Sequence, residues 1–129
     1  MSVQIEGQIK AFCHTTGIAH NAWTTIKSED FKSMTSGAAV DARLKFAEVS
    51  FLNTGASRVY ISFGATPTIN AGNVEADNAV LMRAQAIELS PGSFLHVELA
   101  GTEISQITLR TSDNAATAEL QTHAVLFNR

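Results

Sequence analysis

Residues 44–64 read LKFAEVSFLNTGASRVYISFG, and this stretch decides the fold. Apolar and polar residues alternate on both sides of an Asn-Thr-Gly turn, which is the period-two pattern of strands with one buried face. The first run changes parity between Phe46 and Val49, so both halves can point inward only with a β-bulge near Ala47 and Glu48. We therefore predict two strands joined as a hairpin.

The same pattern continues on both sides of this stretch. Residues 87–110 alternate around a Pro-Gly turn, and residues 118–126 keep one parity almost to the end of the chain. Weaker patterns predict a first strand within residues 3–12 and a second within residues 22–27. About eight short strands result, which is the count of an all-β, antiparallel β-sandwich with a jelly-roll-like arrangement.

The 129 residues are expected to form one sandwich domain, because a chain of this length buries roughly two-thirds of its unfolded surface in one core. Residues 1–40 are the less regular part of that domain. Residues 79–89 contain helix-favouring side chains, but the Ser-Pro-Gly that follows them favours a strand. We predict a strand there.

A long loop is expected over residues 64–78, which contain few large apolar side chains. Loops of this length in compact domains are usually functional or disordered, so we take this one as a candidate contact surface. Its candidate interface residues are Pro67, Asn70, Asn73 and Glu75.

Composition points to contacts with protein. Charged residues make up 16% of the chain and the formal net charge is −3, whereas about 25% charged residues is typical of globular domains. A weakly charged surface resists association with other subunits less than a charged one does. The Lys and Arg residues form no basic stripe, so we expect no direct nucleic-acid binding.

The sequence also indicates the cellular compartment in which the protein is made. The longest apolar runs fall far short of the about 20 residues that cross a bilayer, and the first fifteen residues include Glu6, Lys10 and His14 rather than an apolar signal core. Cys13 is the single cysteine of the sequence, which rules out an intrachain disulfide. We therefore expect no membrane contact and synthesis in a reducing cytoplasm.

Candidate catalytic and metal sites find little support. The four histidines show neither the strand nor the helix spacing of a metal pair, and Cys13 projects away from its neighbour His14 if that segment is extended. A nucleophile elbow and a phosphate-binding glycine loop are missing from the sequence. Acidic residues at 75–78 leave calcium binding as an alternative. We predict no enzyme and no cofactor.

Trp23 and Tyr60 are the single Trp and the single Tyr of the chain. Aromatic rings of this kind pack in cores and interfaces, or stack on sugar rings. We take both as candidate interface aromatics, with a sugar-stacking platform as the alternative.

Three segments carry a resemblance to a known class of protein. Residues 48–64, 89–99 and 107–112 read EVSFLNTGASRVYISFG, LSPGSFLHVEL and ITLRTS. They resemble small β-sandwich structural proteins of tailed bacteriophage particles, in which an x-N-x-G-x-x-x-x-Y-V-x-F-G strand pair precedes an L-x-P-G turn and a closing strand. The resemblance covers about residues 44–127.

The resemblance implies a part of the virus particle, best described as a head decoration or cement protein on the outer capsid surface. Such a protein would bind the major capsid protein and copies of itself, with a homotrimer favoured, and would bridge neighbouring capsid subunits against the pressure of packed DNA. Residues 1–40 and 64–78 would be the clamping surfaces. A head-completion or tail-associated component and a carbohydrate-binding module are the alternatives.

Overall fold

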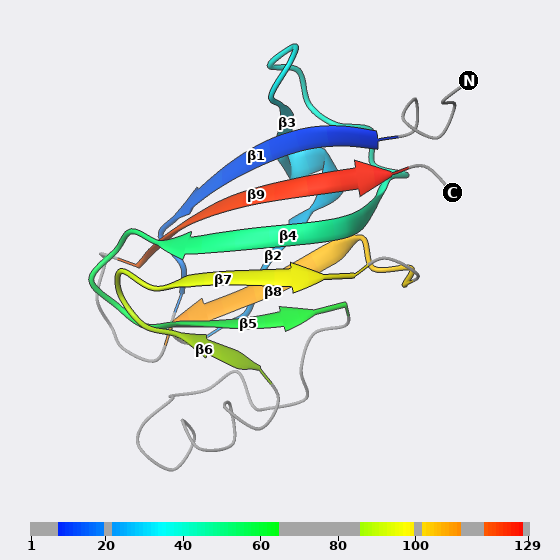
Figure 1. Ribbon diagram of the computed structural model, residues 1–129. Coiled ribbons are helices and arrows are strands. Elements are labelled where there is room, and N and C mark those ends of the chain that lie inside the picture. Colours follow the sequence, from blue (N-terminus) through cyan, green and yellow to red (C-terminus); the bar gives the residue numbers. More distant parts are fainter. Residues whose placement is uncertain (1–7, 20–21, 65–85, 100–101, 112–117, 128–129) are drawn as a thin grey trace.

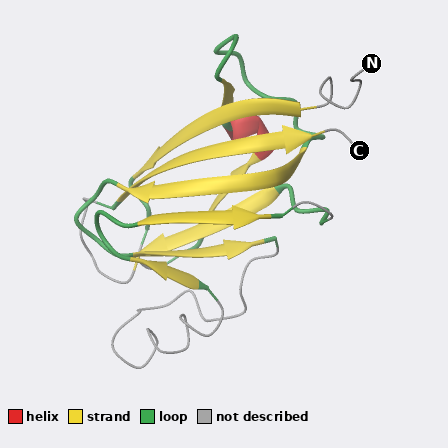
Figure 2. Ribbon diagram, in the orientation of Figure 1, coloured by secondary structure: helices red, strands yellow, loops and turns green. Residues whose placement is uncertain are grey.

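The computed structural model is an antiparallel β-sandwich (Figure 1). Within the described residues, nine strands form two sheets, and one 3-10 turn at Ser28–Asp30 accompanies them (Figure 2). The predicted all-β sandwich is therefore confirmed. The structure describes residues 8–19, 22–64, 86–99, 102–111 and 118–127.

The large sheet faces the viewer in Figure 1. Its strand order is β3-β1-β9-β4-β7. Along this order the strands span Lys32–Ser33, Gln8–Thr16, Glu119–Phe127, Lys45–Asn53 and Phe94–Glu98.

The small sheet packs against the large one and has the order β2-β8-β5-β6. Its strands span Thr24–Lys27, Gln106–Thr111, Val59–Phe63 and Ile87–Leu89.

Strand pairing joins the beginning of the chain to its end. β1 pairs with β9 along its whole length, from Gln8 opposite Phe127 to Thr16 opposite Glu119. Moving inward along the sequence, β2 pairs with β8, β4 with β7, and β5 with β6. The chain is thus a long antiparallel ribbon folded over into two layers.

The core lies between the two sheets and is built from alternate residues of each strand. Phe46 and Phe51 of β4 are fully buried, and their rings lie 5.3 Å from Phe31 and 6.0 Å from Phe63, between ring centroids. Each buried side chain of this size contributes about 1.5–3 kcal/mol of transfer free energy. The predicted bulge is confirmed, because the register of β4 against β9 shifts between Phe46 and Glu48.

The predicted hairpin over residues 44–64 is wrong in its pairing, although both of its strands form. β4 belongs to the large sheet and β5 to the small one, so the turn between them crosses the sandwich instead of reversing within a sheet. The turn around Pro91 and Gly92 does the same between β6 and β7. Both connections are therefore arches.

Asn53 is the physical reason for these arches. Its buried side-chain amide donates to the carbonyl oxygens of Ser57 (2.8 Å) and Leu89 (2.9 Å), which belong to the two different connections. Its own carbonyl accepts from the backbone N–H of Gly92 at 2.8 Å. These bonds hold the two arches together and satisfy a buried amide, which without partners would cost about 1–3 kcal/mol.

The N-terminal region, expected to be less regular, contains the nine-residue strand β1, which lies between β3 and β9 in the large sheet. The second predicted strand is confirmed as β2. Of the segment 79–89, only the end is described, and it forms the strand β6. The loop residues 65–78 lie outside the described residues.

Candidate interaction surfaces

Each sheet has an outer face that points away from the core, and the two outer faces differ. On the small sheet, the register places Arg110 of β8 opposite Tyr60 of β5, and Tyr60 opposite Glu88 of β6. Arg110 and Tyr60 are both 0% exposed although their neighbours Leu109 and Ile61 fill the core. At Tyr60 and Arg110 the small sheet is therefore buried on its outer face as well as on its inner face.

Polar contacts connect the side chains of this row, which consists of Arg110, Tyr60 and Glu88. The Tyr60 hydroxyl donates to Glu88 Oε2 at 3.4 Å, and Arg58 Nε lies 3.3 Å from the same oxygen. The guanidinium carbon of Arg110 lies 5.7 Å from the centre of the Trp23 ring, within the range of a cation–π contact. Burial lowers the pKa of Arg110, which still remains charged at neutral pH because arginine ionises far above it.

Trp23 and Tyr60, the candidate interface aromatics, are thus brought into one small apolar cluster with Ala86. Trp23 is half-buried, and Tyr60 is inaccessible within the chain. Within the described part of the chain, the buried indole Nε1 of Trp23 has no hydrogen-bond partner. The rings therefore pack and stabilise, and Tyr60 offers no exposed platform for a sugar.

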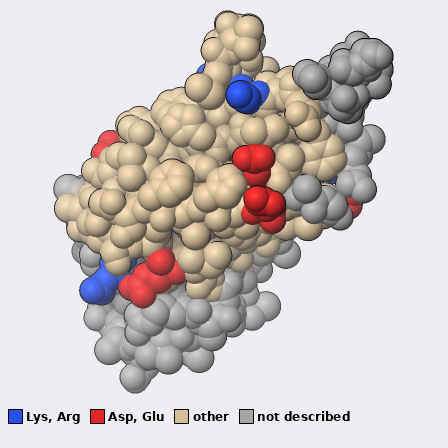
Figure 3. Space-filling view, in the orientation of Figure 1, with Lys and Arg blue, Asp and Glu red and all other residues tan. Residues whose placement is uncertain are grey.

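The outer face of the large sheet, in contrast, is open. Figure 3 looks onto this face and shows mostly uncharged atoms, with charged side chains in a few small groups. The alternate residues of β1, β9, β4 and β7 that point away from the core build it. They include Lys10, Phe12, His14, Glu48, Ser50, Leu52, Phe94, His96, Glu98, Gln121, His123 and Val125.

Exposed apolar side chains stand at one end of this face. Phe94 is 65% exposed and lies directly opposite Leu52, which is 37% exposed. Large apolar side chains exposed together in this way mark contact sites more often than single ones do.

Three of the four histidines share the same face. His123 lies opposite Ser50 in the register, and Ser50 lies opposite His96. The His123 ring packs on Phe12 at 4.9 Å between centroids, and His14 Nε2 lies 3.1 Å from Glu119 Oε2. His20 is outside the described residues.

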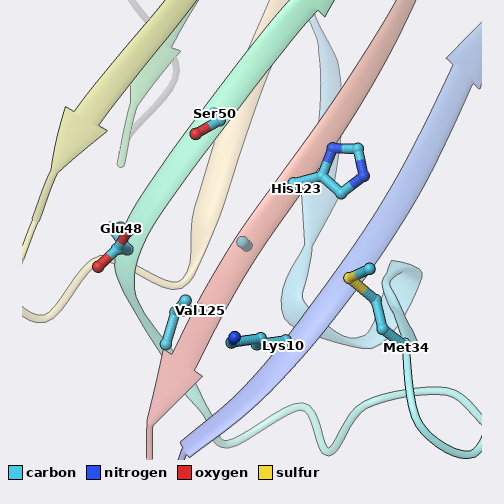
Figure 4. A pocket seen from close by; sticks show the side chains of 7 residues that line it. Lys10, Met34, Glu48, Ser50, His123 and Val125 are labelled. Atoms are coloured by element: carbon cyan, nitrogen blue, oxygen red, sulfur yellow. The ribbon is translucent and has the colours of Figure 1, made fainter.

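A shallow hollow of about 120 Å³ lies on this face around β9 (Figure 4). Its lining includes Lys10, Met34, Glu48, Ser50 and His123. Ligand pockets for small molecules usually measure about 300–1,000 Å³. The hollow is therefore of a size to receive a side chain of a partner protein rather than a cofactor.

One group of residues on this face has the composition of a catalytic triad. Ser50 Oγ lies 2.8 Å from His96 Nδ1, and His96 Nε2 lies 3.7 Å from Glu48 Oε1. However, β4 lies between β7 and β9, so the backbone N–H groups beside Ser50 are engaged in the sheet ladders and none is left to bind an oxyanion. This group can hold the two strands together.

Cys13 faces the core, as its parity predicts, while His14 faces outward. Burial raises the pKa of the Cys13 thiol, which opposes formation of the nucleophilic thiolate. Among the described residues, no three His, Cys, Asp or Glu side chains are grouped closely enough to hold a metal ion.

The candidate loop residues Pro67, Asn70, Asn73 and Glu75 lie outside the described residues. The sequence reasoning did not identify the outer face of the large sheet. The period-two pattern does carry a signal for it, because His14, His96 and His123 each alternate with core residues. What brings the three together is the pairing of β1, β9, β4 and β7, which the pattern does not specify.

A comparison with known protein families and with curated protein sequences finds no match for this chain. Within the described residues, no helix has the length and apolar character needed to cross a membrane.

Proposed function

We propose that this chain is a structural protein of a virus particle, a decoration protein that docks on the capsid through the outer face of its large sheet. The observation that carries the proposal is the exposed pair Leu52 and Phe94 on a weakly charged sheet face. Removing such side chains from water favours docking by roughly 25 cal/mol per Å² of apolar area. A decoration protein also needs no chemistry beyond such binding.

The order of the strands adds support of a weaker kind. A ribbon that pairs β1 with β9, β2 with β8, β4 with β7 and β5 with β6 is the order expected of a jelly roll. Jelly rolls are common in viral capsid domains and also in lectins. One fold serves many functions, so the strand order is compatible with this role and the exposed face carries the proposal.

In this proposal the partners are the major capsid protein and further copies of the chain, on the outer surface of the capsid. The contact surface differs from the clamping segments suggested by the resemblance. It lies on β4 and β7, where the exposed apolar side chains are. The carbohydrate-binding alternative depended on Trp23 and Tyr60, and the burial of Tyr60 gives it no support.

The test is the number of copies in purified particles from cultures that carry the gene. We expect a copy number comparable with that of the shell subunits, measured by quantitative mass spectrometry. A single small ring of copies would indicate a head-completion or tail component instead. If the chain is absent from particles, the proposal is wrong.

A double variant, Leu52→Ser with Phe94→Ser, tests the docking face itself. It should weaken binding to the capsid at least about tenfold in Kd, which corresponds to about 1.4 kcal/mol of binding free energy, and so lower the number of copies per particle. Ile87→Ser is the matched control, because Ile87 is also a large exposed apolar residue, at 41%, but belongs to the small sheet. Equal losses in both variants would argue against this face.

A further inference from the structure

The described strands leave four sheet edges, and β7 is the longest of them. It spans five residues, whereas β2 spans four, β6 three and β3 two. The edge at β3 is also covered, because Ser33 N donates to Ala38 O at 2.8 Å and Lys32 forms a bridge with Ala39. β7 pairs with β4 on one side, and no described strand pairs with its other side.

The hydrogen bonds at its two ends show which backbone groups of β7 face outward. Asn53 N donates to Ser93 O at 3.0 Å, and Leu99 N donates to Ala47 O at 2.8 Å. Because backbone groups alternate in direction along an antiparallel strand, the odd-numbered residues of β7 bond to β4. The N–H and C=O groups of Phe94, His96 and Glu98 therefore point to the open edge.

Natural edge strands usually carry features that prevent pairing with another chain, such as Lys, Pro, a bulge or very short length. β7 reads FLHVE and contains neither Lys nor Pro, and its register against β4 is continuous. Its outward-pointing side chains are those of Phe94, His96 and Glu98. This edge is therefore open to a further strand.

We propose that β7 pairs antiparallel with β7 of a second copy of this chain, on a two-fold axis at Val97. This register places His96 opposite the partner's Glu98, and Glu98 opposite the partner's His96, at positions whose backbone groups face each other. On the inner side it places Leu95 opposite the partner's Leu99. A His directly across from a Glu can donate a hydrogen bond to the carboxylate and forms an ion pair when the ring is protonated, and apolar pairs on the buried side add to this.

Neighbouring registers fit less well. An axis at His96 would place that residue opposite the partner's His96 and Phe94 opposite the partner's Glu98, which loses both His–Glu pairs. An axis at Leu95 would run the strands into the Ser90 to Ser93 turn, where Ser93 N bonds back to Ser90 O at 3.0 Å. The two His–Glu pairs therefore favour the axis at Val97.

The inference does not depend on the proposed function, because it concerns only two copies of the chain. One strand pair buries less than the about 1,200 Å² of a stable protein interface, so the dimer should be weak in solution. It would strengthen wherever copies are held close together. The pairing also leaves the outer face of the large sheet exposed and joins two such faces into one continuous surface.

Sedimentation velocity of the purified chain, from about 10 µM to about 1 mM, tests the proposal. The sedimenting mass should rise from one chain of 13.8 kDa toward two. His96→Glu should weaken the dimer at least about tenfold, since it opposes two acidic side chains across the axis. Adding Glu98→Lys to that variant should restore the dimer, because each pair is then complementary again.

His123→Glu is the matched control, since it makes the same change on the same face but on β9, away from the edge. It should leave the dimer unchanged. The register has its own test, because Val97→Cys should form a disulfide-linked dimer under mild oxidation and Leu95→Cys should not. The wild-type chain, whose single thiol is the buried Cys13, should form none.

Three outcomes would overturn the proposal. The first is a chain that remains monomeric at about 1 mM. The second is a dimer, or the trimer expected from the resemblance, that His96→Glu does not affect. The third is cross-linking through position 95 instead of position 97. A failure here leaves the copy number in particles untouched, so it is distinguishable from failure of the proposed function.

Discussion

The outer faces of the two sheets follow the same period-two pattern but are put to different uses. On the small sheet, Tyr60 and Arg110 point away from the core and are nevertheless completely buried. On the large sheet, Phe94 and Leu52 point away from the core and remain exposed. The direction of a side chain relative to the core therefore does not decide whether it is exposed. Of the two outer faces, the one with the more polar side chains, Tyr60 and Arg110, is the buried one. The difference suggests that one face stabilises the fold and the other contacts partners.

The largest expected effect is on the free energy of unfolding, and it distinguishes the outer face of the small sheet from that of the large sheet. Arg110→Ala should lower the free energy of unfolding by about 2–5 kcal/mol, because it removes a fully buried long side chain and leaves a void beside Trp23. Arg110→Met, which fills much of the same volume, should cost less. Urea unfolding monitored by Trp23 fluorescence measures both. His123→Ala on the open face is the control, and a loss as large there would remove the distinction.

A smaller effect tests the polar contacts within the buried row. Tyr60→Phe should cost about 1 kcal/mol, because it removes the hydroxyl that donates to Glu88. In a Glu88→Gln background the same change should cost less, and a double-mutant cycle gives the difference. Equal costs in the two backgrounds would mean that the hydroxyl acts through packing alone.

On the open face, apolar side chains should contribute little to stability. Leu52→Ser should change the free energy of unfolding by no more than about 0.5 kcal/mol, as for other surface positions. The adjacent residue Phe51 points into the core, and Phe51→Ala should cost about 3–5 kcal/mol. Denaturant unfolding of the two variants compares the faces of one strand. A large loss in Leu52→Ser would mean that this face is covered within the chain.

The smallest effect concerns a charge contact that belongs to neither face. The Arg43 side chain, which donates to the Asp41 carboxylate, lowers the pKa of Asp41 to about 2 from its ordinary 3.8. A depressed carboxyl pKa stabilises the fold above pH 3.8, and this contribution is lost as the pH falls toward 2. Asp41→Asn should remove that part of the acid dependence, so the variant should be slightly less stable than the wild type at pH 7, as expected for an exposed ion pair, and the difference should vanish near pH 2. Thermal unfolding between pH 2 and pH 7 measures it.

Much of the fold was predictable, because the strands follow a local rule. Alternation placed the strands around Phe51, Ile61 and Val97, and the change of parity before Val49 gave the bulge. It also placed Cys13 and His14 on opposite sides of β1. Each of these predictions depends only on residues that are neighbours in the sequence.

The pairing of the strands was not predictable in the same way. The Asn-Thr-Gly turn is compatible with a hairpin or an arch, and the choice depends on Leu89, which lies 36 residues from Asn53. The burial of Tyr60 likewise depends on long-range packing, so the two candidate aromatics could not be placed from their sequence positions. The open face with its three histidines forms only when β1, β9, β4 and β7 pair correctly, and the local sequence pattern does not specify that pairing.

The pairing of β1 with β9 has a consequence for how this chain reaches its native state. The longest ladder of the large sheet joins Gln8 to Phe127, so β1 must wait until β9 has left the ribosome before it can form this ladder. Domains dominated by such distant pairings fold in about milliseconds to seconds, more slowly than helical bundles. During that interval the apolar side of β1 has no native partner, and a chaperone that recognises extended apolar segments would have its best opportunity to bind.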